Sequence, residues 1–92
     1  MKIVKDENLA KLFDLYQNIL SGTQKDFLQD FIYRDLTLSE IAENNMISRQ
    51  AASDAIKKGI ARIQDIEEKL GFMKIIECLE EQIEKLERKV NA

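Results

Sequence analysis

Hydrophobic residues near the start of the chain recur at the spacing of an α-helix. Between residues 8 and 20 they fall three or four positions apart, which predicts one helix with a broad apolar face. A polar break at residues 21–23 ends this helix. Thr23 is then expected to cap a second helix, with Asp26 at its third position and an end near Arg34. The residues expected to face inward from these two helices are Leu9, Leu12, Phe13, Tyr16, Ile19, Leu20, Phe27, Leu28, Phe31 and Ile32.

A second pair of helices is predicted after a short polar stretch. Thr37 and Glu40 form a capping-box pattern, which predicts a short helix over residues 38–44. A brief turn leads to Ser48, a preferred N-cap residue, and from there to a long helix that Gly71 is expected to terminate. The apolar residues of the long helix recur every three or four positions, at Ala52, Ile56, Ile60, Ile63, Ile66 and Leu70.

The last stretch, residues 72–91, changes to a heptad pattern. Two apolar slots alternate along it, with Glu, Lys and Arg in most of the positions between them. The pattern covers fewer than three full heptads, less than a long coiled coil shows, so two outcomes stay open. The helix either self-associates or binds a partner through this seam, or it folds back onto the first helices. The seam residues are Phe72, Ile76, Leu79, Ile83, Leu86 and Val90.

Composition supports a small helical protein. The chain has 92 residues, of which 45% are hydrophobic and 34% charged, with three Gly and no Pro. A chain of this length buries enough surface for one core, so residues 1–92 are expected to form a single domain. The predicted fold class is all-α, with a helix-turn-helix over about residues 37–62 and a C-terminal amphipathic helix over about residues 72–91.

The helix-turn-helix prediction depends on a few small and apolar residues. Ala42 allows the second helix to approach closely, while Ile41 and Ile47 are expected on either side of the crossing. The turn between the helices needs a residue in the left-handed region. Asn45 tolerates this conformation better than Met46, so Asn45 is expected to adopt it unless the turn has another form.

The outward face of the second helix carries side chains suited to DNA. Arg49 can pair with guanine and Gln50 with adenine, while a Ser or Lys side chain can contact phosphate. Between residues 48 and 62 four basic residues stand against one acidic residue, although the whole chain has a net charge of −3. A solvated helix surface with an Asp54 to Lys58 pair is the alternative. The candidate DNA-binding residues are Ser48, Arg49, Gln50, Ser53, Asp54, Lys57 and Lys58.

Little in the chain suggests catalysis, a metal site or a cofactor. There is no His, and Cys78 is the one Cys, placed away from the apolar seam. Two pairs of consecutive glutamates, at 67–68 and 80–81, point about 100° apart on a helix and are expected to be solvated. The first residues lack the pattern of a signal peptide, and no apolar run is long enough to span a bilayer. We therefore expect a cytoplasmic protein that is not an enzyme.

The aromatic residues divide by position. Tyr33 is expected to be partly exposed. Those expected in the core are Tyr16, Phe27, Phe31 and Phe72.

Several segments together resemble a known family. LFDLYQNIL, QKDF, LTLSEIAE, ISRQAASDAIKK and EEKLG are similar, in this order and spacing, to the YlxM family of small proteins like region 4 of bacterial sigma factors. The resemblance covers nearly the whole chain. It implies a DNA-binding regulatory protein linked to the signal recognition particle pathway. By matching positions, the residues that it places on the recognition helix are Ser48, Arg49, Gln50, Ser53, Asp54 and Lys57. It also implies an alternative, a module that binds a signal recognition particle component or RNA polymerase.

Overall fold

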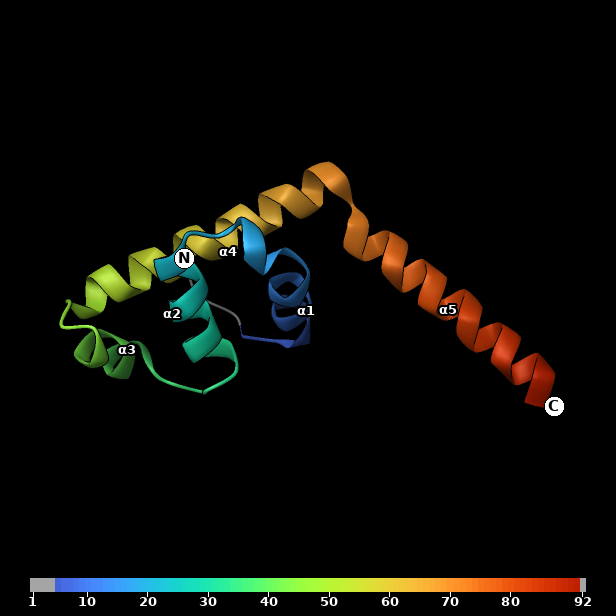
Figure 1. The fold of residues 1–92 in the computed structure, drawn as a ribbon, viewed down its shortest axis with the longest axis horizontal. Coiled ribbons are helices and arrows are strands. Elements are labelled where there is room, and N and C mark those ends of the chain that lie inside the picture. The colour runs from blue at the N-terminus through green and yellow to red at the C-terminus, as the bar shows by residue number, and fades with distance from the viewer. Residues whose placement is uncertain (1–4, 92) are drawn as a thin grey trace.

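The computed structural model describes residues 5–91, which form five α-helices and one short 3₁₀-helix. The predicted all-α fold is confirmed. Figure 1 shows α1, α2 and α3 on one side of the long helix α4, while α5 turns away from it. None of the described helices is both long and apolar enough to cross a membrane. The elements are α1 (Glu7–Tyr16), η1 (Gln17–Ile19), α2 (Gly22–Ile32), α3 (Leu38–Asn44), α4 (Arg49–Leu70) and α5 (Phe72–Asn91).

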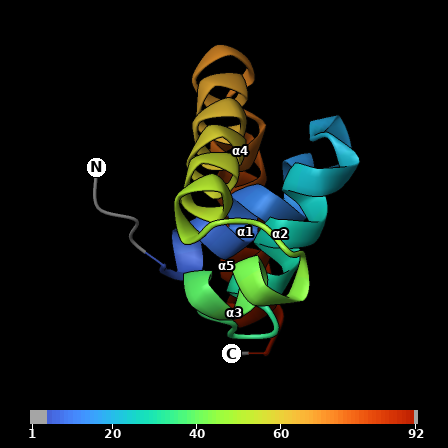
Figure 2. The same cartoon turned by 90° about the vertical axis from the view of Figure 1, so that its left-hand side faces the viewer.

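The core lies between α4 and the three helices beneath it. Each of these helices contributes fully buried side chains, among them Phe13 from α1, Leu28 from α2 and Ile41 from α3. α4 supplies Ala52, Ile56, Ile60 and Ile63, which repeat at helical spacing along its inner face. The end-on view in Figure 2 shows the same arrangement, with α1, α2 and α3 gathered under one face of α4. α4 is therefore the element that holds the domain together.

The first helix ends earlier, and the second helix begins earlier, than the sequence pattern predicts. α1 stops at Tyr16 and continues as η1, so Ile19 packs against the core from a 3₁₀ turn. The predicted cap at Thr23 is wrong, because Ser21 caps α2. The Ser21 hydroxyl accepts the Gln24 amide at 3.2 Å, and the Gln24 side chain accepts the Ser21 amide at 3.4 Å. This reciprocal pair satisfies two amides at once, which fixes the start of the helix.

The predicted capping box of α3 is confirmed. Thr37 accepts the Glu40 amide at 3.1 Å, and the Glu40 carboxylate accepts the Thr37 amide at 3.1 Å. α3 spans Leu38–Asn44, as its pattern predicts. Its short length means that burial of Ile41 and Ala42, rather than helix propensity, holds it in place.

The turn between α3 and α4 places Met46, not Asn45, in the left-handed region. Met46 has a φ of 55°, whereas Asn45 has a φ of −108°, so the expectation for Asn45 is wrong. The Asn45 side chain donates to the Ile41 carbonyl at 2.7 Å and remains part of the helix end. The Met46 amide then donates to Glu43 and the Ile47 amide to Ala42, at 3.2 and 3.0 Å. These two bonds form a Schellman motif, which requires the reversal at the residue after the cap.

A bend at Gly71 separates α4 from α5. Gly71 has a φ of 67°, and its amide donates to the Glu67 carbonyl at 2.8 Å, so the predicted terminator is confirmed. The Glu67 carboxylate accepts the Tyr16 hydroxyl at 2.6 Å and the Met73 amide at 2.9 Å. One side chain therefore joins α1, α4 and α5 at the bend. The expectation that Glu67 is simply solvated is wrong.

The hydrogen bond from Tyr16 is the main cause that lowers the pKa of Glu67, and the Met73 and Lys74 amides act in the same direction. Desolvation opposes them. Burial, followed by the bond to Glu67, raises the pKa of the Tyr16 hydroxyl. The bend is therefore most stable with Glu67 ionised and Tyr16 protonated.

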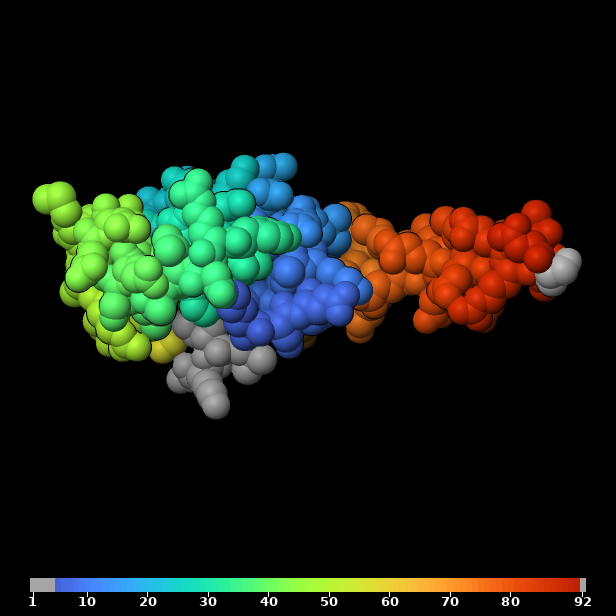
Figure 3. Space-filling model, turned by 90° about the horizontal axis from the view of Figure 1, so that it is seen from below, coloured from blue at the N-terminus to red at the C-terminus, as the bar shows by residue number. Residues whose placement is uncertain are grey.

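α5 does not fold back onto the first helices. Beyond its first turns it projects from the domain, as the space-filling view in Figure 3 shows, and the molecule measures 56 × 26 × 23 Å. The prediction that Phe72 lies in the core is wrong, because 48% of it is exposed. The short link through Gly71 aims α5 outward before its apolar seam can reach the core. Tyr16 and Phe27 are buried as predicted, Phe31 is partly buried, and Tyr33 is exposed.

Met46 provides a test of the turn. We expect Met46→Gly to increase the free energy of unfolding by about 1 kcal/mol, because glycine adopts a positive φ without the steric cost that a side chain incurs. The Met46 side chain is 92% exposed, so its removal sacrifices little packing. Urea denaturation followed by circular dichroism measures the change. Asn45→Gly is the matched control and should be destabilising, since it removes the bond to Ile41; equal effects of the two changes would contradict this account.

Glu67 gives the stability of the protein a pH dependence. Because its folded pKa is lowered, its stabilisation is complete above the ordinary carboxyl pKa of 4.5 and is lost as the pH falls through the lowered value. We expect Glu67→Gln to reduce the loss of stability between neutral and acidic pH. Thermal denaturation across that range measures it, with Glu68→Gln, at an exposed neighbouring position, as the control. An unchanged pH profile for Glu67→Gln would exclude this role.

Candidate nucleic-acid interface

α3 and the turn after it present the first turn of α4 to solvent. Ser48 has extended backbone, and its hydroxyl accepts the Ala51 amide at 3.0 Å, so the predicted cap is confirmed. Ala42 and Ala52 are buried at the base of this unit, where small side chains allow the two helices to lie close. Ile41 is fully buried as expected, but Ile47 is 37% exposed and is not part of the core. The start of α4 is thereby held from one side and open on the other.

Ser53 is the one candidate that the fold removes from the surface. Only 7% of it is exposed, so the prediction that it faces outward is wrong. It lies three residues before Ile56 and seven before Ile60, which places it on the inner face of α4. A small side chain is required there because the helix packs against the core.

The exposed face of α4 carries a row of polar residues one turn apart. Gln50, Asp54 and Lys58 are all exposed and follow each other at intervals of four residues. The Gln50 side-chain amide donates to the Asp54 carboxylate at 2.9 Å. Arg49 is also exposed, whereas Lys57 is only partly so and lies at the edge of this face. The structure therefore exposes Ser48, Arg49, Gln50, Asp54 and Lys58 along the first half of α4, with Lys57 at their margin.

The charge at this end is positive but small. A helix N-terminus carries a partial positive charge, and no acidic residue lies in the first turn of α4. Residues 48–62 contain four basic residues and one acidic residue, Asp54. Glu40 and Glu43 on α3 are exposed nearby in sequence and reduce the surplus to one over residues 37–62. Such a surface favours a few placed phosphate contacts over general attraction to nucleic acid.

Two residues that hold α4 in place, one within the helix and one near its end, were not predicted from the sequence. Gly59 lies inside α4, and a Cβ there would come within 2.8 Å of the Leu28 side chain, so α2 packs against α4 at a point where only glycine fits without adjustment. An isolated glycine inside a helical pattern is a usable signal of such close packing. Glu67 is the other, and its partner Tyr16 lies 51 residues away. Nothing local in the sequence connects those two side chains.

The fold and the exposed start of α4 define the class of this protein as an all-α helix-turn-helix protein. The chain belongs to the UPF0122 family, whose description is "Putative helix-turn-helix protein, YlxM / p13 like", and the family model matches residues 3–92. The resemblance to the YlxM family predicted from the sequence is confirmed. The family description names a helix-turn-helix and no enzymatic activity.

Individual relatives agree with this assignment. The UPF0122 protein YlxM of Bacillus subtilis is 37% identical over 86 residues, covering 94% of this chain and 78% of that protein. A UPF0122 protein of Malacoplasma penetrans is 41% identical over 73 residues, which cover 79% of this chain and 68% of that protein. A UPF0122 protein of Fusobacterium nucleatum is 50% identical over 64 residues, which cover 70% of this chain but only 62% of that relative.

Proposed function

We propose that this protein binds duplex DNA through the start of α4 and acts as a transcriptional regulator. The observation that carries the proposal is the exposed, side-chain-capped N-terminus of a 22-residue helix, held by α3 so that Arg49 and Gln50 face solvent. In a helix-turn-helix the N-terminal residues of the second helix contact base edges while the first helix lies across the backbone.

The exposed residues suit different parts of a duplex. Arg49 has the donor geometry for guanine or for phosphate. Lys58 is exposed further along α4 and is suited to a second phosphate. Gln50 has the geometry for adenine but donates to Asp54 in the free protein, so it must exchange that bond for one to a base. Asp54 opposes phosphate by its charge and adds selectivity through the contacts that it disfavours.

The net charge of the chain is consistent with weak attraction to nonspecific DNA. For a monomer that contacts about four phosphates, the logarithm of the binding constant falls with the logarithm of the salt concentration with a slope near −3.6. Two copies bound together have about twice that slope. Two bound copies therefore gain affinity without a more basic surface.

The resemblance to the YlxM family supports a narrower proposal, in which the regulated genes belong to the signal recognition particle pathway. Chromosomal DNA as the ligand places the protein in the cytoplasm.

A second candidate function rests on a different observation. The apolar seam of α5 is exposed and lies apart from the DNA-binding end, so the protein is alternatively an interaction module for a signal recognition particle component or RNA polymerase. A pull-down with such a purified component distinguishes the two functions. Capture that survives Arg49→Ala and Gln50→Ala but is lost with Leu79→Asp favours the interaction module.

Arg49→Ala tests direct contact with DNA. We expect it to weaken binding to the target by about 1 to 3 kcal/mol if Arg49 contacts a base, and to reduce the salt slope by about 1 if it contacts only phosphate. Gel shifts of the purified protein against its own upstream region, at two salt concentrations, measure both. Lys69→Ala is the matched control, because Lys69 is exposed at the far end of α4, where it pairs with Asp65 at 2.8 Å. Equal affinity of the two variants and the wild type would exclude Arg49 from the site.

Asp54→Asn tests the orientation of the outward row. Removing this charge should strengthen DNA binding by about 1 kcal/mol at low salt, and the gain should shrink as salt screens the phosphates. The asparagine keeps an acceptor for Gln50, so the local bond is preserved. Asp65→Asn, near the other end of α4, removes the same charge far from the proposed contact and should leave binding unchanged. A loss of affinity with Asp54→Asn would mean that this carboxylate contacts the bases itself.

A further inference from the structure

The seam of α5 is an apolar surface that the described domain does not cover. Its six residues, Phe72, Ile76, Leu79, Ile83, Leu86 and Val90, are each between 40% and 84% exposed. They form one stripe, because their alternating spacings of four and three keep them on one side of the helix. A continuous apolar stripe of this length is unusual on a monomer and marks a surface that associates.

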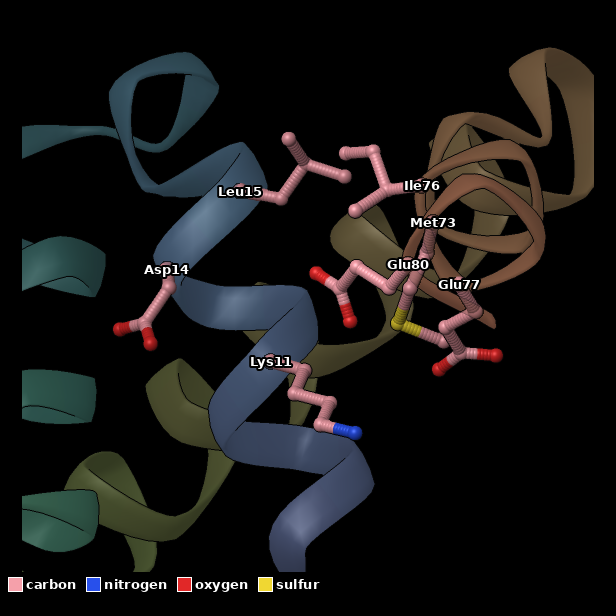
Figure 4. Close-up of a pocket in the computed structure, with 7 residues that line it drawn as sticks. All are labelled: Lys11, Asp14, Leu15, Met73, Ile76, Glu77 and Glu80. Carbon is pink, nitrogen blue, oxygen red and sulfur yellow. The ribbon is translucent and has the colours of Figure 1, made fainter. Parts of the chain in front are cut away.

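The stripe begins in a groove between α1 and α5. Figure 4 shows Leu15 of α1 pointing toward Ile76 of α5, with Met73 deeper between the helices. Lys11 from α1 and Glu77 and Glu80 from α5 line its rim, while the Asp14 carboxylate points away from α5 and accepts the Tyr33 hydroxyl. The groove has a volume of about 290 Å³, at the lower limit of the roughly 300 to 1,000 Å³ typical of small-molecule sites. Because it opens onto the stripe, a helix that covers both fits better than a compact ligand.

We propose that the occupant is a second copy of this chain, whose α5 lies antiparallel along the first. The distal half of each α5 then enters the groove between α1 and α5 of the other copy. Such a contact is isologous, so the two copies bury the same surface and the assembly closes as a dimer. This inference is independent of DNA binding.

The spacing of the seam is self-complementary in the antiparallel direction. With Leu79 opposite the partner copy's Ile83, Ile76 meets Leu86 and Phe72 meets Val90, so all six residues find a partner in one register. Each layer then combines a larger with a smaller or differently branched side chain, and the layers have similar volumes. A parallel pair would instead place Phe72 against Phe72 and Val90 against Val90, which makes one layer crowded and another loose.

The charges on α5 also favour the antiparallel direction. Residues 72–81 contain Lys74 against three glutamates, whereas residues 82–91 contain three basic residues against two glutamates. An antiparallel dimer places the basic half of one helix beside the acidic half of the other, where Glu77 and Glu80 line the groove together with Lys11. A parallel dimer would align the acidic halves. Two like-charge approaches remain, one between the two copies of Glu80 near the twofold axis and one between Lys11 and the basic half of the other copy's α5.

The oligomeric state tests whether the stripe joins two copies. Sedimentation velocity over a range of concentrations should show a monomer–dimer equilibrium for the wild type and loss of the dimer for Leu79→Asp. Cys78→Asp is the matched control, because it adds the same charge at the adjacent, exposed position outside the stripe and should retain the dimer. Circular dichroism confirms that both variants keep the helical core, to which Leu79 does not belong.

Disulfide trapping then tests the direction and register. In a Cys78→Ser background, Ile76→Cys combined with Leu86→Cys should form a covalent dimer under mild oxidation. The two sites lie ten residues and about 15 Å apart on one helix, too far for a bond within a chain. Leu86→Cys alone should stay uncrosslinked in an antiparallel dimer but would crosslink in a parallel one.

Three results overturn the proposal. They are a wild type that stays monomeric at submillimolar concentration, a crosslink with Leu86→Cys alone, and a dimer that persists in Leu79→Asp. A monomeric wild type whose stripe is needed to capture a purified signal recognition particle component or RNA polymerase would assign the stripe to a different protein.

Discussion

Burial of one face of α4 is the constraint on which this structure depends. Ala52, Ile56, Ile60 and Ile63 repeat along that face, and α1, α2 and α3 are arranged around them. At 22 residues the helix is longer than any of the three helices that pack on it, so it extends past the core at both ends. Two features follow from that excess length: the exposed first turn of α4, and the bend from which α5 departs.

The two ends of α4 are held by different means. At its start, a Schellman motif and a serine cap use backbone amides, and the left-handed Met46 is the conformational cost of that tight reversal. At its end, the Glu67 carboxylate accepts hydrogen bonds from Tyr16 of α1 and from the Met73 amide of α5. A turn made of backbone bonds tolerates most side chains, whereas a partly buried carboxylate that accepts hydrogen bonds depends on one residue and on pH. The two ends of the domain therefore respond differently to mutation and to acid.

The exposed start of α4 and the seam of α5 are separate surfaces, and this separation suits the proposed DNA binding and dimerisation. A recognition helix with a small local surplus of positive charge gains from being presented twice, because phosphate contacts from two copies add. The α5 seam lies at the opposite end of α4 from Arg49, so association through it leaves the proposed DNA-contacting turn open. Association and DNA binding then use different residues and are separable by mutation.

Much of this protein is determined by the sequence alone, because its strongest signals are local. The helical periodicity, the Thr37–Glu40 box, the Ser48 cap and the Gly71 terminator each act within a few residues, and the helices they predict are present. Family membership follows from the same segments. The sequence pattern also predicts most of the exposed start of α4, since cap and periodicity together set which residues face outward.

The tertiary structure decided the features that depend on what a residue packs against. Ser53 is buried because its side of α4 faces the core, and Glu67 is a junction because its hydrogen-bond donor Tyr16 lies 51 residues away. The direction of α5 was likewise open, since its seam is equally suited to folding back or to projecting. The one-residue bend at Gly71 and the bond from Met73 to Glu67 aim it outward. Contacts between distant segments leave no periodic trace, and so no inspection of neighbouring residues reveals them.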